Sequence, residues 1–222
     1  MKARAFLLLA MLTAAEPCLA AETNLVANGS FNLSQRKTDA PDDWTAAGDP
    51  AVRQQLLLGA GRDGERCAKL VCTEFNGDGP AAHAMICQVG KISVRRGQWY
   101  RLTLWAKEEG IRGGAIEVAL SKTRPWGSSG LADAFVVGSK WQRFEFRFRA
   151  TDDLPAETSR LQFWFKSSGT LWLDDVVLEA TDSGQEWFPQ ISTAGAKNSI
   201  PNSSFECGTA NWGSFTYGLR GW

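Results

Sequence analysis

The chain has 222 residues, and its 24 Lys plus Arg residues balance its 24 Asp plus Glu residues, so that the formal net charge is zero. A protein that binds nucleic acid needs a basic excess to neutralise phosphates, and this balance therefore argues against a nucleic-acid partner. A neutral ligand suits the composition better.

Residues 1–21 have the layout of a secretory signal peptide. Lys2 and Arg4 precede an apolar run from Ala5 to Ala15, and the small-residue stretch Cys18–Ala21 follows. A membrane-spanning helix needs about 20 apolar residues, more than this run supplies, and no later stretch is long and uncharged enough. We therefore expect an exported protein, secreted or periplasmic, without a membrane span.

The rest of the chain reads as β-strands. Apolar and polar residues alternate with a period of two, clearly so from Trp99 onward, and no segment of useful length has a helical period. Clusters of Gly and Pro, such as Gly77–Pro80 and Gly127–Gly130, separate the runs, as turns between antiparallel strands require. The predicted strands are 52–58, 67–75, 82–89, 100–107, 116–121, 143–149, 161–166 and 171–178.

This pattern predicts an all-β fold, a two-sheet antiparallel β-sandwich or jelly roll in which each strand buries one face. The apolar positions of the regular strands are the candidate core. They are Tyr100, Leu102, Leu104, Phe144, Phe146, Phe148, Leu161, Phe163 and Phe165.

Four cysteines follow the predicted signal peptide: Cys67, Cys72, Cys87 and Cys207. An oxidising compartment permits disulfides, and four cysteines allow three complete pairings. Cys67 and Cys72 are five residues apart in one predicted strand, so their side chains face opposite sides of the sheet and do not pair with each other. We expect Cys72 to pair with Cys87 across the loop 76–80, and Cys67 and Cys207 can equally be free.

Five sequence motifs follow one another in a recognisable order: NLVANGSF (24–31) with PDDW (41–44), GQWYRLTLWAK (97–107), WQRFEFRFRA (141–150), LQFWFKSSG (161–169) and LWLDDVVLE (171–179). Together they resemble the secreted carbohydrate-binding modules of families 4, 9 and 22 over about residues 24–179. The resemblance implies a galactose-binding-domain-like jelly roll that binds a polysaccharide or oligosaccharide on its concave sheet or at the loops at its edge. It also implies that such a module is usually attached to a glycoside hydrolase.

A glycan site needs exposed aromatic rings with amide, carboxylate or guanidinium groups nearby, because sugars combine apolar C–H faces with hydroxyls. Trp105 and Trp164 occupy the polar side of their predicted strands, together with Arg101, Glu117 and Gln162. If these strands share a sheet, the two rings form an aromatic floor surrounded by polar groups, which is the predicted carbohydrate site. The alternative is that N-terminal loops cover both rings and make them a satellite core.

Trp126 lies in a Pro-Trp-Gly-Ser-Ser-Gly segment between predicted strands, where a tryptophan has little intrinsic reason to be. We expect it to form a side wall of the carbohydrate site; the alternative is that it plugs one end of the sandwich. Trp44, Trp99, Trp141 and Trp172 match positions that look structural, capping strands or closing the sandwich, and are left out of the site.

Two adjacent carboxylates, Asp174 and Asp175, lie in the last predicted strand, where alternation must place one of them inward. A buried carboxylate is costly unless it is paired or bound to a metal. The family resemblance suggests a structural calcium ion between this strand and the residues just after the first motif, where Asn32 stands, since oxygen ligands suit calcium. The alternative is that Asp174 or Asp175 accepts hydrogen bonds from turn amides.

The opening motif returns near the end of the chain, where Asn24–Asn32 (NLVANGSFN) is matched by Asn198–Glu206 (NSIPNSSFE). In the second copy Glu206 stands in the place of Asn32, so the first copy lacks a carboxylate that calcium would favour. We expect a module over 22–179, a linker over 180–197, and over 198–222 the start of a second module or a C-terminal extension.

We therefore predict a secreted, non-catalytic polysaccharide-binding module of a larger hydrolase-like or cell-surface protein. The first alternative is a structural or adhesive jelly roll that packs against a protein, and the second is a polysaccharide lyase or hydrolase on the same sandwich. The single histidine, His83, lies close to a Gly/Pro loop with no nucleophile or metal-binding motif around it, which gives catalysis no support. Calcium is the only cofactor that the sequence suggests.

Overall fold

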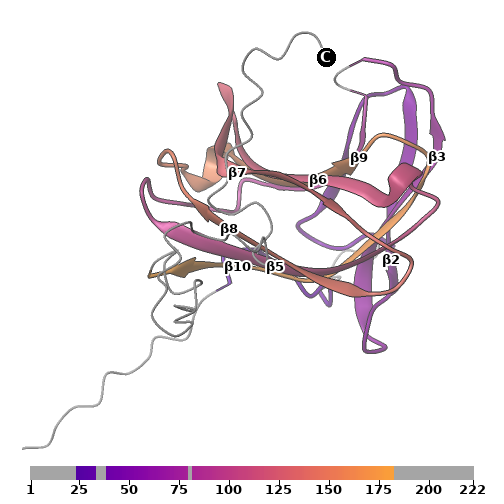
Figure 1. The fold of residues 1–222 in the computed structure, drawn as a ribbon, viewed down its shortest axis with the longest axis horizontal. Coiled ribbons are helices and arrows are strands. Elements are labelled where there is room, and N and C mark those ends of the chain that lie inside the picture. The colour runs from indigo at the N-terminus through magenta and orange to yellow at the C-terminus, as the bar shows by residue number, and fades with distance from the viewer. Residues whose placement is uncertain (1–23, 34–38, 80–81, 183–222) are drawn as a thin grey trace, which may run out of the picture.

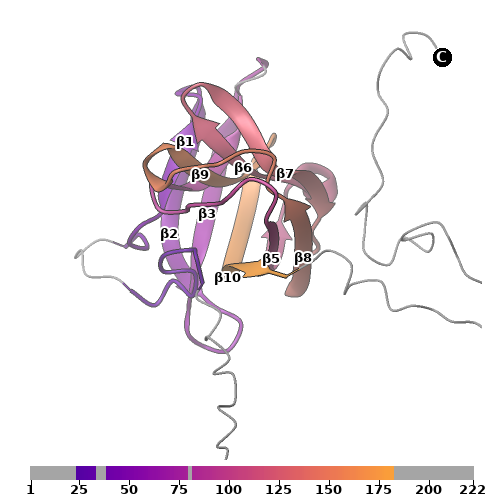
Figure 2. The same cartoon turned by 90° about the vertical axis from the view of Figure 1, so that its left-hand side faces the viewer.

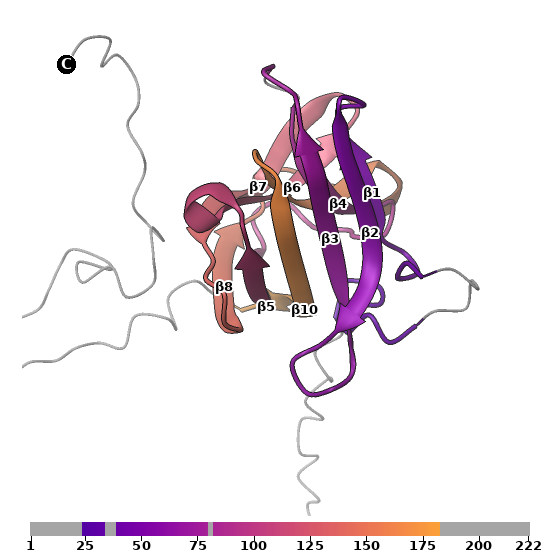
Figure 3. The same ribbon diagram turned by 90° about the vertical axis from the view of Figure 1, so that its right-hand side faces the viewer.

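A computed structural model describes residues 24–33, 39–79 and 82–182, and over these ranges the chain forms two five-stranded antiparallel sheets packed on each other (Figure 1). Sheet A has the strand order β1-β4-β9-β6-β7, and sheet B has the order β2-β3-β10-β5-β8. Figure 2 shows the two layers from the side, and Figure 3 shows the strands of sheet B side by side. The all-β, two-sheet prediction is confirmed.

The strands are β1 (Thr45–Gly48), β2 (Val52–Ala60), β3 (Arg66–Phe75), β4 (Ala84–Val89), β5 (Trp99–Glu109), β6 (Ala115–Thr123), β7 (Trp126–Val136), β8 (Gln142–Arg149), β9 (Ser159–Phe165) and β10 (Gly169–Thr181). Two short 3-10 turns, η1 (Arg112–Gly114) and η2 (Ala156–Thr158), lie between strands. No helix within the described residues is long and apolar enough to cross a membrane. The predicted signal peptide and second module lie outside the described residues.

All eight predicted strands are present, but the expectation of a turn at Gly127–Gly130 is wrong. These residues belong to β7, an edge strand that pairs with β6 alone. Gly130 has a φ of 116°, and a Cβ atom there would lie 2.4 Å from the carbonyl oxygen of Arg149. Glycine is therefore required by a close approach of two strands rather than by a turn.

The core lies between the two sheets and contains the predicted residues. Seven of the nine are buried, and Phe144 and Phe146 are partly buried against the same cluster. Their rings lie 4.7 Å and 5.2 Å from that of Phe135 on β7, measured between centroids. These aromatic pairs close the edge of the sandwich between β7 and β8.

The N-terminal segment joins both sheets. The Asn24 side chain donates to the carbonyl of Val176 (3.0 Å) and accepts from the amide of Leu178 (3.0 Å), both on β10. Three residues later, the main chain of Ala27 forms two hydrogen bonds with the Gln88 side chain on β4 (3.0 and 2.7 Å). The first motif is thus held against the last strand of sheet B and against β4 of sheet A.

The predicted Cys72–Cys87 disulfide is wrong, and both residues are free, as is Cys67. Cys72 lies on β3 of sheet B and points into the core, whereas Cys87 lies on β4 of sheet A and points away from it. Cys67 faces the side of β3 opposite to Cys72, as predicted. Burial raises the pKa of all three thiols, which keeps them protonated; Cys207 lies outside the described residues.

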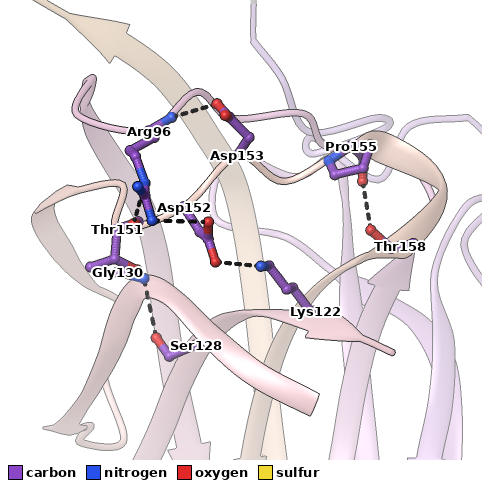
Figure 4. A network of polar contacts seen from close by, with 9 residues as sticks. All are labelled: Arg96, Lys122, Ser128, Gly130, Thr151, Asp152, Asp153, Pro155 and Thr158. Carbon is purple, nitrogen blue, oxygen red and sulfur yellow. Dashed lines mark hydrogen bonds and ion pairs between the residues drawn. The ribbon is translucent and has the colours of Figure 1, made fainter. Parts of the chain in front are cut away.

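An ion-pair network ties together three loops at one end of the sandwich (Figure 4). Asp152, between β8 and β9, accepts from Lys122 of β6 and lies 3.4 Å from the Arg96 guanidinium of the β4–β5 loop. The Arg96 main chain also donates to Asp153 (2.9 Å). Lys122 pairs with Gly127 next to the turn of the β6–β7 hairpin, so the network anchors this hairpin close to the end that carries Trp126.

The network predicts a pH-dependent effect of Asp152→Asn. The hydrogen bond from Lys122 is the main reason why the pKa of Asp152 lies below its usual 3.8. A depressed carboxylate pKa stabilises the fold above the unfolded pKa, and this contribution is lost as the pH falls through the folded value. We expect the variant to melt at a lower temperature than the wild type at pH 7, with the difference shrinking as the pH falls below 3.8 and vanishing once the pH is below the folded pKa.

Thermal unfolding followed by circular dichroism at neutral and acidic pH measures this difference. Glu157→Gln is the matched control, because Glu157 is an exposed acid on η2 with no ion pair to a described residue. An equal loss of melting temperature at both pH values would contradict the proposed role of the carboxylate charge.

Candidate functional site

Trp105 and Trp164 do not share a sheet, and the predicted single aromatic floor is wrong. Trp105 is on β5 of sheet B and Trp164 is on β9 of sheet A, and both point away from the core. The two rings therefore lie on opposite outer faces of the sandwich. Of the other predicted residues, Arg101 accompanies Trp105, whereas Glu117 and Gln162 accompany Trp164.

The outward-facing residues of the three central strands of sheet A form what we call the sheet A face. They are Met85 and Cys87 on β4, Arg160, Gln162 and Trp164 on β9, and Glu117, Ala119 and Ser121 on β6. Gln162 lies at the centre, with the small side chains of Cys87 and Ala119 on the paired strands beside it. Gln162 is only 2 % exposed, whereas Trp164 and Arg160, two residues away on either side in β9, are partly exposed.

Two polar atoms of this face are buried without a hydrogen-bond partner among the described residues: Oε1 of Gln162 and Nε of Arg160. Buried polar groups in proteins nearly always have a partner, because an unsatisfied donor or acceptor costs about 1–3 kcal/mol. The amide oxygen accepts a hydrogen bond and the Nε–H group donates one. A hydroxyl group, which both donates and accepts, can satisfy either atom.

Aromatic rings lie at both ends of this pair. The half-buried ring of Trp164 lies 6.3 Å from the ring of His83, between centroids. At the other end, the Arg160 guanidinium lies 5.2 Å from the ring of Trp126. Trp126 begins β7 rather than lying in a loop, and at 62 % exposed it is available to a ligand at the edge of the sheet A face.

Charged groups border Trp164 and balance one another. Lys166 lies 3.9 Å from the Glu117 carboxylate. Burial lowers the pKa of His83, and the nearby Lys166 lowers it further, so that the imidazole is neutral at neutral pH. The face thus offers an aromatic ring, an amide, a guanidinium and a carboxylate without a strong excess of either charge.

Arg160 was missing from the sequence-based site although a signal for it was present. The predicted strand started at 161, whereas β9 starts at Ser159. Positions 160, 162 and 164 share one face by the same period of two that placed Trp164 there. A strand boundary two residues earlier would have included the guanidinium.

On the outer face of sheet B, Trp105 and Arg101 are already engaged within the protein. The Arg62 guanidinium covers the Trp105 ring at 4.5 Å from its centroid, and Arg101 forms an ion pair with Glu179. Trp141 and Trp172, predicted to be structural, also lie on this side, where lysine ammonium groups contact their rings. Arg101 and Trp105 are therefore separated from the sheet A face by the whole core.

Of the two adjacent aspartates, Asp174 binds main-chain amides and Asp175 binds a guanidinium group. Asp174 accepts from the amides of Arg62 (3.0 Å) and Asp175 (2.9 Å), and Arg62 forms an ion pair with Asp175 (3.3 Å). Burial raises the pKa of Asp174. Asp175 has a φ of 48° at a register shift of β10. This irregularity breaks the simple alternation on which the prediction of one inward-facing carboxylate rested.

This arrangement does not fit a calcium cage. Calcium takes six to eight oxygen ligands, and within the described residues no three acidic, histidine or cysteine side chains gather to hold a metal. Asn32 is occupied elsewhere, because its amide nitrogen donates to Glu65 and its oxygen accepts from the amide of Arg66. The Arg62 guanidinium supplies the positive charge beside Asp175 instead.

No protein-family model matches the chain. No curated protein matches it either. Solved structures do match it, and one of them is a family 4 carbohydrate-binding module (18 % identity, TM-score 0.50, covering 64 % of this chain and 98 % of that chain). A second is the N-terminal cellulose-binding domain of Cellulomonas fimi β-1,4-glucanase C (17 % identity, TM-score 0.51, 71 % of this chain and 97 % of that chain).

A third is an arabinose-bound family 51 α-L-arabinofuranosidase (13 % identity, TM-score 0.56, 71 % of this chain), of which the match spans only 26 %. Two of the three are binding modules matched over nearly their whole length, and the third is a longer enzyme. At these identities the likeness concerns the fold. This chain has the jelly-roll fold of carbohydrate-binding modules, as the sequence resemblance implied.

Proposed function

We propose that the sheet A face binds a neutral polysaccharide and that the module is a non-catalytic binding unit of a secreted protein. The observation that carries the proposal is a pair of buried atoms, Gln162 Oε1 and Arg160 Nε, that have no hydrogen-bond partner in the described part of the chain and lie beside the half-buried ring of Trp164. A sugar ring stacks its C–H face on an indole, and its hydroxyls complete the hydrogen bonds of the amide and the guanidinium.

The type of glycan follows from the charges of the face. Arg160 and Lys166 are cationic and Glu117 is anionic, with the Lys166–Glu117 pair neutralising one of each. Since His83 is neutral, only the Arg160 charge is left over, and its ring contact with Trp126 holds it to one side. An uncharged polymer fits this balance, and the cellulose-binding domain among the similar structures makes β-linked glucans the first candidates.

The proposed role in the parent protein is one of local concentration. A module tethered to a hydrolase raises the effective concentration of the attached enzyme at its polymeric substrate without any chemistry of its own. The similar α-L-arabinofuranosidase supports this arrangement, because the matched fold makes up only 26 % of that enzyme's chain. We propose export through residues 1–21 as the route to such a substrate.

Trp164→Ala tests the site directly. We expect the affinity for the bound glycan to fall by about tenfold, roughly 1.4 kcal/mol, because the stacking platform is lost. Isothermal titration calorimetry against soluble β-glucan, xylan, mannan and galactan measures it. Trp105→Ala is the matched control, since it removes a similar ring from the opposite face and leaves binding unchanged.

Binding that is absent for all four polymers, or that is equally strong in Trp164→Ala, would refute the proposal. In that case, release of reducing ends from the same polymers would point to a hydrolase, and a protein ligand on this face would point to an adhesive module. Circular dichroism of each variant verifies that the fold is intact.

Gln162→Met is predicted to change stability and binding in opposite directions. Methionine has a similar length but no polar atom, so the variant removes a buried, unsatisfied oxygen and is expected to melt at a higher temperature without ligand. It also removes an acceptor for a sugar hydroxyl, so affinity is expected to fall severalfold. If stability drops and affinity is unchanged, Gln162 has a structural role and not the one proposed.

Binding and folding are proposed to be independent of calcium. We expect the melting temperature and the glycan affinity to be the same in excess EDTA and in millimolar CaCl₂, because Arg62 and main-chain amides satisfy the aspartates. Arg62→Met keeps the alkyl chain but leaves Asp175 without its cation, and is expected to lower the melting temperature. A calcium-induced rise in the melting temperature of the wild type would overturn this prediction.

A further inference from the structure

The outer face of sheet B carries a tryptophan with a lysine on each side. Lys69 on β3, Trp172 on β10 and Lys107 on β5 are paired in one row across the three strands, which Figure 3 shows side by side. The ammonium groups of Lys69 and Lys107 lie 5.3 Å and 4.9 Å from the centroid of the Trp172 ring. Lys107 is also 4.9 Å from the ring of Trp141.

These two ammonium groups have no carboxylate partner among the described residues, unlike three of the arginines on the same face. Arg101 is paired with Glu179, and Arg143 and Arg147 share Glu145. Contact with an aromatic ring orients an ammonium group but does not cancel its charge. The row therefore presents two positive charges held on one ring. The distance between the two ammonium groups cannot exceed the sum of their distances to the Trp172 centroid.

The indole rings also restrict the conformations of the two lysine side chains, which favours the binding of an anion. A free lysine side chain loses considerable rotamer entropy when it binds, and part of that loss has already occurred where the chain is held on an indole. Each ammonium group keeps N–H donors that point away from the ring and can reach a carboxylate. Lys69 and Lys107 are both half-buried, so water screens this interaction less than it would on an open surface.

We propose that Lys69, Trp172 and Lys107 form a second binding site, which takes an acidic polysaccharide with a carboxylate on successive sugars. Each of the two lysines contacts one carboxylate of the polysaccharide, and the exposed part of the Trp172 indole between them contacts the apolar face of a sugar. Nucleic acid fits less well, because its binding involves many phosphate contacts and most of the arginines of this face are already paired with carboxylates. This site is separate from the neutral-glycan site on the sheet A face.

Affinity electrophoresis of the full chain through gels that contain polygalacturonate tests the proposal. We expect retardation of the wild type at low salt that weakens as salt is added. In Lys69→Met/Lys107→Met, which keeps the alkyl packing on Trp172, the affinity is expected to fall at least tenfold. The control Arg53→Met/Lys91→Met removes the same charge from elsewhere and is expected to bind like the wild type.

Trp164→Ala separates this site from the proposed function, since it is expected to lose neutral glycan but keep polygalacturonate binding. The proposal is overturned if the wild type is not retarded, if both double variants lose retardation equally, or if Trp164→Ala loses it as well. Retardation by DNA or by anionic lipid vesicles as strong as that by polygalacturonate also overturns it, because the site would then recognise charge alone.

Discussion

The docking of the N-terminal segment on β10 is the contact on which the rest of the sandwich depends. Val176 donates its amide to the carbonyl of Gly29 (2.9 Å), and a Cβ atom on Gly29 would lie 1.9 Å from the Val176 carbonyl oxygen. Only glycine permits this approach. Asn24 and Asn28 hold the segment on either side, through β10 and through the carbonyls of Leu33 and Asp42.

This contact explains why the fold needs both the opening motif (24–31) and the motif of the last strand (171–179). The opening motif has no strand of its own within the described residues. The Asn24 side chain bonds the main chain of β10, and the main chain of Ala27 bonds the Gln88 side chain of β4. Phe31 then packs on Trp44 (5.2 Å between ring centroids), and Trp44 on Phe163, which carries the contact into sheet A. One segment thereby closes the core and is hydrogen-bonded to both sheets.

The two outer faces differ in how their polar groups are satisfied. On sheet B, Arg101, Arg143 and Arg147 meet glutamates, whereas Lys69 and Lys107 meet indole rings and have no carboxylate partner among the described residues. On sheet A two uncompensated hydrogen-bonding atoms lie beside small residues and a half-buried indole. A face that leaves buried atoms unsatisfied is less stable than it can be, which is typical of surfaces built to meet a ligand.

The strand pattern and the core were predictable because alternation is local: Leu161, Phe163 and Phe165 point into the core for the same reason that Gln162 and Trp164 point away from it. A face, however, is defined relative to a sheet, and period two says nothing about which sheet a strand joins. That is why Trp105 and Trp164 were placed together and why Cys72 was paired with Cys87. The sequence by itself determined the fold class, eight of the ten strands in the described residues and the side of these strands that leaves the core, since these follow from local periodicity. Only the tertiary structure decided which faces meet, that Arg160 joins Gln162, and that Arg62 neutralises Asp175, because those contacts join residues far apart in the chain.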